Sequence, residues 1–170
     1  ADITVRDQNG DTALLLAASN GNTECVQILL DANADIAVCD EDGGTALLLA
    51  ASNGHTECAQ VLLDAKADIA ATNEYSNSAL LLAMLCGHTE CMLMLLDAKA
   101  DITASNEYGD TALILAVSEG RTQYVQMLLD AKADTALANE NGDTPLTCAA
   151  LHGHSVCTRM LLDARADVAV

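Results

Sequence analysis

The chain repeats itself every 33 residues along its whole length of 170 residues. An Ala-Asp pair followed by Ile, Thr or Val marks each repeat and recurs at Ala1, Ala34, Ala67, Ala100, Ala133 and Ala166. A unit this short cannot enclose a hydrophobic core, so its apolar side must be buried against its neighbours. The period predicts one domain, residues 1–170, made of stacked repeats. Its parts are repeats 1–33, 34–66, 67–99, 100–132 and 133–165 and the start of a further unit, 166–170.

Each repeat carries the pattern of two short helices. In the first repeat, apolar residues cluster over residues 12–20, where Thr12 or Asp11 can cap the N-terminus and Gly21 can end the helix. Apolar residues recur at helical spacing again over residues 22–32. The segment that follows is polar and rich in turn residues, which predicts an extended loop. The expected fold class is an all-α repeat solenoid, a stack of helix-turn-helix units joined by extended finger loops.

These residues resemble the ankyrin repeat. The stretch from Asp7 to Asn22 is similar to the family pattern D-x-x-G-x-T-P-L-H-x-A-A-x-x-G-H, and the stretch from Leu29 to Asp35 is similar to the later pattern L-L-x-x-G-A-D. The resemblance extends over all five repeats. It implies that the finger loops and first helices line a concave surface, and that this surface binds other proteins.

Two family positions are replaced throughout. The His that follows Pro-Leu in the pattern is Leu15, Leu48, Leu81, Ile114 and Thr147. The usual hydrogen bond from Thr to this His is therefore expected to be lost, and an aliphatic column is expected to replace it. The Gly after the second helix is Asn33, Lys66, Lys99, Lys132 and Arg165, where we expect a left-handed backbone. The strain is on the order of 1 kcal/mol, and a cation at a helix C-terminus offsets about 0.3–1 kcal/mol of it.

One position of the second helix recurs every 33 residues and forms a column of five residues, which are Cys25, Cys58, Cys91, Tyr124 and Cys157. This spacing predicts small buried hydrophobic residues rather than disulfides, with Tyr124 as a packing residue. Cysteines used in this way favour a reducing, cytoplasmic location.

Zinc binding is the alternative for these cysteines, because His55, His88 and His154 each precede one of them by three residues. A structural zinc site needs four converging ligands, whereas each His-Cys pair belongs to a different repeat. The three histidines stand where the ankyrin pattern has a His at the start of the second helix. We therefore expect them to be structural, with no metal site, and expect His152 to be a contact residue.

Motifs of catalysis and cofactor binding are missing from the sequence, which has no G-x-S-x-G, P-loop, paired His-Glu motif or Gly-rich dinucleotide turn. A repeat stack also offers a shallow groove rather than a pocket that excludes water. Neither enzyme activity nor a cofactor is expected. The longest apolar stretches, such as residues 79–86, fall far short of the roughly 20 residues of a membrane span. The chain does not open with a secretory signal, although a longer precursor could have lost one.

Acidic residues outnumber basic residues by 25 to 7, and the formal net charge is −18. More than half of the acids recur in register and belong to the scaffold, whereas the others fall on the fingers or at the ends of first helices. This distribution predicts an acidic groove that attracts a basic protein segment. The alternative is that the acids only keep a Leu-rich array in solution. Nucleic acid is not an expected partner, because phosphate contacts require clustered Lys and Arg.

The fingertips lose their polar character in two repeats, where Tyr75 and Tyr108 occupy the tip. A Tyr ring can be buried in an interface while its hydroxyl keeps a hydrogen bond. Adjacent repeats are expected to place the two rings near one another. The alternative is that each ring packs on a neighbouring finger, particularly as Ser76 replaces the turn Gly of the third repeat.

The ends of the first helices change in parallel with the fingertips, from Ser-Asn in two repeats to Leu85-Cys86, Ser118-Glu119 and Leu151-His152. An apolar patch rimmed by acids is expected. The predicted partner-binding residues are Glu41, Asp42, Glu74, Tyr75, Asn77, Leu85, Cys86, Glu107, Tyr108, Asp110, Ser118, Glu119, Leu151 and His152.

The sequence thus predicts a non-catalytic protein-binding module that holds a basic segment of a partner on its acidic fingers and first helices. Two alternatives remain open: an architectural spacer within a longer ankyrin array, and an engineered repeat scaffold. The first repeat is as apolar as an internal one, so further repeats are expected before it. The chain is expected to be a monomer or to associate weakly end to end.

Overall fold

The computed structural model describes the backbone of residues 2–168 and the side chains of residues 2–164. The chain divides into two compact units, Ala1–Ala100 and Asp101–Val170. Unit 1 contains α1 (Ala13–Ser19), α2 (Thr23–Asp31), α3 (Ala46–Ser52), α4 (Thr56–Asp64), α5 (Ala79–Leu85) and α6 (Thr89–Asp97). Unit 2 contains α7 (Ala112–Ser118), α8 (Thr122–Asp130), α9 (Pro145–Leu151) and α10 (Ser155–Val168).

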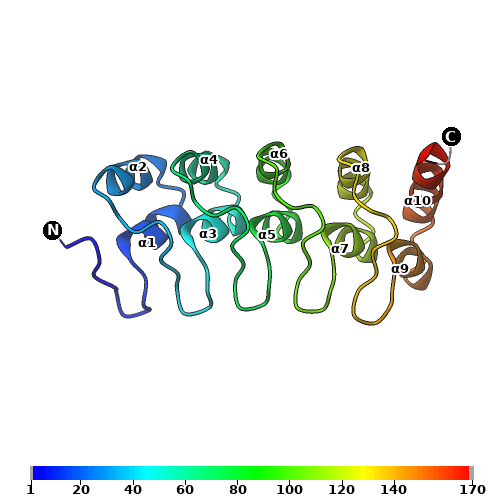
Figure 1. Cartoon of the computed structure of the whole chain (residues 1–170), viewed down its shortest axis with the longest axis horizontal. Coiled ribbons are helices and arrows are strands. Elements are labelled where there is room, and N and C mark those ends of the chain that lie inside the picture. Colours follow the sequence, from blue (N-terminus) through cyan, green and yellow to red (C-terminus); the bar gives the residue numbers. More distant parts are fainter. Residues whose placement is uncertain (1, 169–170) are drawn as a thin grey trace. The chain divides into compact units, whose positions relative to one another are not determined.

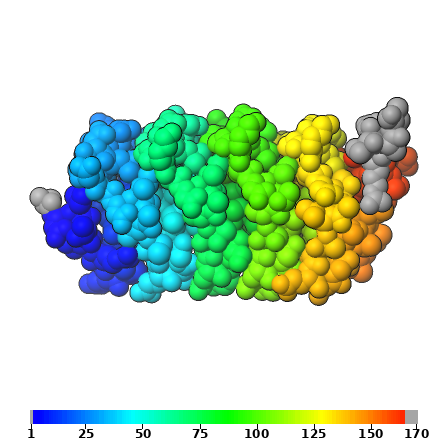
Figure 2. All heavy atoms as spheres, viewed as in Figure 1, coloured from blue at the N-terminus to red at the C-terminus, as the bar shows by residue number. Residues whose placement is uncertain are grey.

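Within each unit the helices form two rows. In unit 1, α1, α3 and α5 pack side by side in one row, and α2, α4 and α6 form the other (Figure 1). In unit 2, α7 packs on α9, and α8 packs on α10. A finger loop precedes each first helix, and the repeats of unit 1 follow one another as bands in direct contact (Figure 2). The predicted all-α repeat solenoid is confirmed.

Aliphatic side chains fill the space inside each unit. Leu15, Leu48 and Leu81 are at most 1 % exposed in unit 1, and Ile114 is 1 % exposed in unit 2. The predicted aliphatic positions are therefore buried. Complete burial of one such side chain contributes about 1.5–3 kcal/mol, so these positions account for much of the stability of each layer.

The fifth repeat differs at this position, because Thr147 is exposed. The backbone N–H of Thr144 donates to Thr147 Oγ1 at 2.8 Å, and the N–H of Thr147 donates to Thr144 Oγ1 at 3.3 Å. No His stands here to make the Thr-to-His bond of the family pattern, but a hydrogen-bonded Thr pair that the sequence did not lead us to expect takes its place. A Thr hydroxyl supplies the acceptor that Leu or Ile lacks, and a reciprocal capping box results.

Residues after the second helices adopt the predicted left-handed conformation in four repeats, with φ of 62° at Asn33, 71° at Lys66, 68° at Lys99 and 65° at Lys132. The prediction was wrong for Arg165, because α10 continues through this position to Val168. The side chain of Arg165 lies outside the described residues. So do residues 169–170, and the start of a further unit stays a prediction.

The cysteine column is buried in three of its four cysteine positions. Cys58, Cys91 and Cys157 are at most 1 % exposed, and Tyr124 is 8 % exposed, which confirms its packing role. Cys25 is exposed, so its predicted burial was wrong. A cysteine of this column faces the preceding repeat, since Cys58 Sγ of the second repeat lies 3.1 Å from Thr23 Oγ1 of the first. In the described part of unit 1, no helix packs on that side of α2.

Candidate functional site

The fingers of unit 1 are held in shape at their base. In the second repeat, Asp40 Oδ1 accepts hydrogen bonds from the amides two and four residues later, at 3.0 and 2.6 Å. In the third repeat, Asn73 Oδ1 accepts the equivalent pair at 3.1 and 3.0 Å. The N–H of Glu74 donates to the carbonyl of Asp42 at 2.9 Å and joins the two fingers. These hydrogen bonds therefore hold the backbone of both fingertips in place.

The tips in unit 1 combine one aromatic ring with several carboxylates. Tyr75 is 48 % exposed, and Glu41, Asp42 and Glu74 are exposed around the same pair of fingers. Ser76, directly after the ring, holds a left-handed φ of 59° where the other repeats have Gly. The structure thus brings together four of the predicted binding residues on the finger surface of unit 1.

Three other predicted residues of unit 1 lie away from these tips. Asn77 is half-buried at the finger base, and its Oδ1 has no hydrogen-bond partner among the described residues. Leu85 is half-buried at the end of α5, and the exposed Cys86 forms its C-cap, 3.7 Å from Ser52 Oγ. Because the finger precedes α5 and Leu85 ends it, a seven-residue helix of about 10 Å separates them. The apolar helix end and the ring therefore lie at different ends of the third repeat's first helix, and the expected apolar patch stays a prediction.

The first finger of unit 2 repeats the design of the third repeat. Asn106 Oδ1 accepts from the amides of Tyr108 and Asp110, both at 3.0 Å. Asp110 Oδ1 accepts a hydrogen bond from Asn139 Nδ2 at 2.8 Å, so this carboxylate links its finger to the next one. Tyr108 is 62 % exposed, and Glu107 beside it is exposed as well. The expected closeness of this ring to the ring of Tyr75 stays a prediction.

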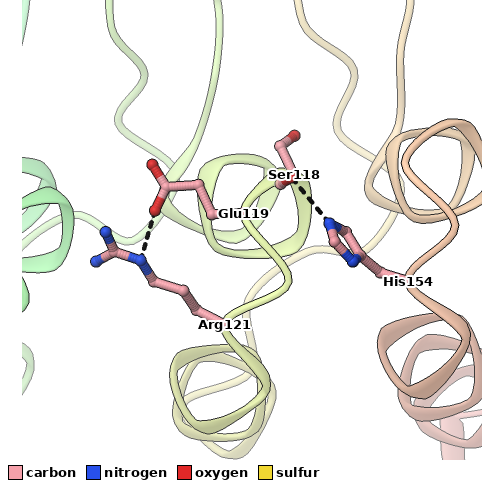
Figure 3. Close-up of polar contacts among 4 residues, drawn as sticks. All are labelled: Ser118, Glu119, Arg121 and His154. Atoms are coloured by element: carbon pink, nitrogen blue, oxygen red, sulfur yellow. Dashed lines mark hydrogen bonds and ion pairs between the residues drawn. The ribbon is translucent and has the colours of Figure 1, made fainter.

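The helix ends of unit 2 carry polar contacts within the scaffold (Figure 3). The carbonyl of Ser118 lies 3.1 Å from His154 Nε2. Glu119 Oε2 pairs with Arg121 Nε at 2.5 Å, and the Arg121 guanidinium lies over the Tyr124 ring, 5.7 Å from its centroid. Ser118 and Glu119 therefore make contacts within the scaffold, and their part in partner binding stays a prediction.

The end of α9 is more open. Leu151 is 73 % exposed. His152 is exposed too, with Nδ1 2.9 Å from the carbonyl of Cys148, and its ring stacks on that of His154 with centroids 6.0 Å apart. Among the predicted helix-end residues of unit 2, Leu151 offers the apolar surface.

The histidines at the starts of second helices have a role that the sequence reasoning did not assign. His55 Nε2 lies 3.1 Å from the carbonyl of Ser19, and His88 Nε2 lies 3.0 Å from the carbonyl of Ser52. Each ring therefore links its own repeat to the C-terminal end of the first helix in the preceding repeat. A Cβ at Gly54 would lie 2.4 Å from the His88 ring. The signal that could have revealed this contact is the Gly that stands 34 residues before each of these histidines, at Gly21, Gly54 and Gly120.

Burial lowers the acidity of three of the cysteines. Burial, with a smaller contribution from Glu90, raises the pKa of Cys91 from 9.0 to about 11. Burial also raises the pKa of Cys148 and of Cys157. Among the described residues, no group of three or more His, Cys, Asp or Glu side chains is placed to hold a metal ion. The thiols of Cys91, Cys148 and Cys157 are therefore protonated packing groups near neutral pH.

An open hollow of about 280 Å³ lies at the second-helix side of unit 1. Thr23, His55, Glu57 and Glu90 are among its lining residues. It is separate from the fingertips, and its carboxylates belong to the acids that recur with the period.

A family model described as ankyrin repeats, three copies, matches residues 1–73, 32–106, 66–137 and 100–170, so its overlapping matches span the whole chain. The chain belongs to the ankyrin repeat family. Ankyrin repeats are generally protein–protein interaction modules and are typically non-catalytic. A search of curated proteins gives no significant match. In the described part of this ankyrin repeat chain, no helix has the length and hydropathy needed to cross a membrane.

Proposed function

We propose that this ankyrin repeat chain is a non-catalytic module that binds a basic, extended segment of a partner protein on the finger surface of each unit. The observation that supports this most directly is the exposure of two fingertip rings, 48 % for Tyr75 and 62 % for Tyr108. Each ring stands on a finger whose backbone is fixed at its base. A ring held in this way loses little conformational entropy when a partner covers it.

Charge is the argument for a basic partner. Glu74 directly precedes the ring in unit 1, and Glu41 and Asp42 are exposed on the neighbouring finger, with Glu41 beside Gly10 of the first finger. Glu107 directly precedes the ring in unit 2. Lys and Arg side chains can place their charge near these carboxylates, or over a Tyr face at a gain of about 0.5–1 kcal/mol at an exposed site. The net charge of −18 would also speed the encounter with a basic segment.

The ends of the first helices are proposed as secondary contacts. Leu85 and Cys86 in unit 1 and Leu151 and His152 in unit 2 lie at the far ends of first helices from the fingers. An extended segment that follows a finger along its first helix reaches both points. Asn77, Asp110, Ser118 and Glu119 would act through the scaffold. The support for this is that Asn77 and Asp110 lie at finger bases and that Ser118 and Glu119 make contacts within unit 2.

Capture of proteins from a eukaryotic lysate at two salt concentrations tests the proposal. The Tyr75→Ala, Tyr108→Ala double variant should lose partners that the unchanged chain retains. A Glu41→Gln, Asp42→Asn, Glu74→Gln variant should weaken the same partners at low salt. Leu93→Gln is the matched control, because Leu93 is exposed on α6 where three other repeats have Gln.

Helicity measured by circular dichroism must be equal for all variants. Partners that the tyrosine variant loses, that salt weakens and that the control keeps would support the module. Identical capture by all four proteins, or capture of nothing, would favour the spacer, in which the finger surfaces have no partner.

A further inference from the structure

The third and fourth repeats carry the same pair of side chains at the fingertip. Glu74 directly precedes Tyr75 in unit 1, and Glu107 directly precedes Tyr108 in unit 2. All four residues are exposed. We call each pair a Glu-Tyr tip. The fingertips of the other repeats have no aromatic residue and read Gln8-Asn9, Glu41-Asp42 and Glu140-Asn141.

The backbone of each Glu-Tyr tip is held at the ring. The amide of Tyr75 donates to Asn73 Oδ1 at 3.1 Å, and the amide of Tyr108 donates to Asn106 Oδ1 at 3.0 Å. The Cα atoms of consecutive residues lie about 3.8 Å apart. A carboxylate and an aromatic face therefore start from almost the same point on each tip, and one planar cation can reach both.

The chain already holds one guanidinium between a carboxylate and a Tyr ring. Arg121 Nε pairs with Glu119 Oε2 at 2.5 Å, and the guanidinium carbon lies 5.7 Å from the centroid of the Tyr124 ring (Figure 3 shows the ion pair). The side chains of Arg121 and Glu119 are 32 % and 40 % exposed. This arrangement therefore forms at a partly exposed surface, from the same three groups that a Glu-Tyr tip and an incoming Arg would supply.

Charge at the tips favours a cation that comes from a partner. Among the described residues, Glu74 and Glu107 form no ion pair. The described lysines stand after the second helices, at Lys66, Lys99 and Lys132. Because the net charge of the chain is −18, a guanidinium that arrives at a tip lowers the repulsion among its carboxylates.

We propose that each Glu-Tyr tip binds one arginine side chain of the partner and selects Arg over Lys. This inference rests on the proposed function, because it names the residue by which the basic segment would be recognised. A planar guanidinium can lie on the Tyr face while its edge donates two parallel hydrogen bonds to the Glu carboxylate. A Lys ammonium is a compact, strongly hydrated charge with no flat face, so it cannot make both contacts equally well.

Two synthetic peptides of about twelve residues test the proposal, with Arg or Lys at every third position, which recurs about every 10 Å in an extended chain. Gly, Ser and Ala fill the other positions. Fluorescence anisotropy of the labelled peptides gives their affinities. NMR of the chain with ¹³C-labelled Tyr rings shows where they bind, since there are three Tyr residues. Tyr124 is the internal control, because it is buried and already lies under Arg121.

The Arg peptide should shift the ring signals of Tyr75 and Tyr108 and leave the signal of Tyr124 in place. It should bind roughly three- to tenfold more tightly than the Lys peptide. The Tyr75→Leu, Tyr108→Leu double variant should lose most of this preference, because it lacks the aromatic faces. The Tyr75→Phe, Tyr108→Phe variant should keep the preference, since Phe retains the face. Equal helicity by circular dichroism is required of both variants.

The carboxylates are tested separately. Glu74→Gln, Glu107→Gln should weaken binding of the Arg peptide roughly fivefold or more at low salt. Glu24→Gln, Glu57→Gln is the matched control, because it removes the same charge from two exposed positions on second helices, where the fourth repeat has Gln123. The control should weaken binding much less.

Three results would overturn the proposal in different ways. Equal affinity for the two peptides, with both ring signals shifted, would remove the selection of Arg but leave a module that binds basic segments. Binding of the Arg peptide that shifts neither Tyr75 nor Tyr108 would place the basic site away from the Glu-Tyr tips. If neither peptide binds the unchanged chain at low salt, the arginine site and the basic partner of the proposed function are both wrong.

Discussion

The buried rows and the fingertips of unit 1 follow different rules. Leu occupies the same buried position in all three repeats, as Leu15, Leu48 and Leu81. The tip, by contrast, is Asn9, then Asp42, then Tyr75. Both regions have a constant backbone, since the fingers repeat their hydrogen bonds as faithfully as the helices do. Packing therefore dictates the residue type only where neighbours enclose the side chain, and the exposed tips can vary to select a partner.

The largest expected effect comes from the buried row. Leu48→Ala should lower the free energy of unfolding by about 2–5 kcal/mol, because Leu48 is 1 % exposed and its removal leaves a cavity. Chemical denaturation measures the loss. Leu93→Ala is the control, since 46 % of Leu93 is exposed and it should cost well under half as much. Equal losses for the two variants would contradict the separation between buried and exposed positions.

The next effect concerns the ties between repeats. His88→Ala should cost about 1–2 kcal/mol, because it removes the contact of 3.0 Å between His88 Nε2 and the carbonyl of Ser52 and leaves that carbonyl without this partner. His152→Ala should cost less, since His152 is exposed and contacts a carbonyl one turn away in its own repeat. A larger loss for His152 would show that ties between repeats contribute little to stability.

The sequence predicted the features that depend on one repeat and its period. The helix boundaries, the left-handed residues after four second helices and the buried aliphatic positions all follow from residue types at fixed spacing. The exposure of Cys25 did not follow, because burial depends on whether a neighbouring layer covers the position. The contact of His55 with the preceding repeat was also missed, because local helix propensity does not predict a hydrogen bond between side chains and backbone of different repeats. The patch predicted from Tyr75 and Leu85 stays a prediction, because the finger precedes α5 and Leu85 ends it.

A smaller effect tests the buried cysteine column by pH. Burial raises the pKa of Cys91 from 9.0 to about 11, so the folded state holds the thiol proton more tightly than the unfolded state does. Below pH 9 the thiol is protonated in both states and contributes no pH dependence. Between pH 9 and about 11 the unfolded state gains by ionising, so the free energy of unfolding should fall as pH rises. Denaturation of the unchanged chain and of Cys91→Ala over this window measures the difference.

Leu93→Ala provides the comparison for that experiment, because Leu93 is exposed and carries no titratable group. It should show the same fall with pH as the unchanged chain, whereas Cys91→Ala should show a shallower one. An unchanged slope for Cys91→Ala would mean that its thiol ionises equally well in both states.

The smallest effect lies in the fingers themselves. Ser76 has a φ of 59°, a conformation that costs a residue with a Cβ roughly 1–2 kcal/mol. Ser76→Gly should therefore stabilise the chain, but by less than about 1 kcal/mol, because Gly loses more backbone entropy on folding. Gly43→Ser, the reverse change on the neighbouring finger, should destabilise it by a similar amount or more, since a Cβ there would lie 3.2 Å from the backbone nitrogen of Glu74. Thermal denaturation compares the pair. If both variants are neutral, the fingers tolerate a side chain at this turn, and Ser76 beside Tyr75 carries no strain that a binding role would have to offset.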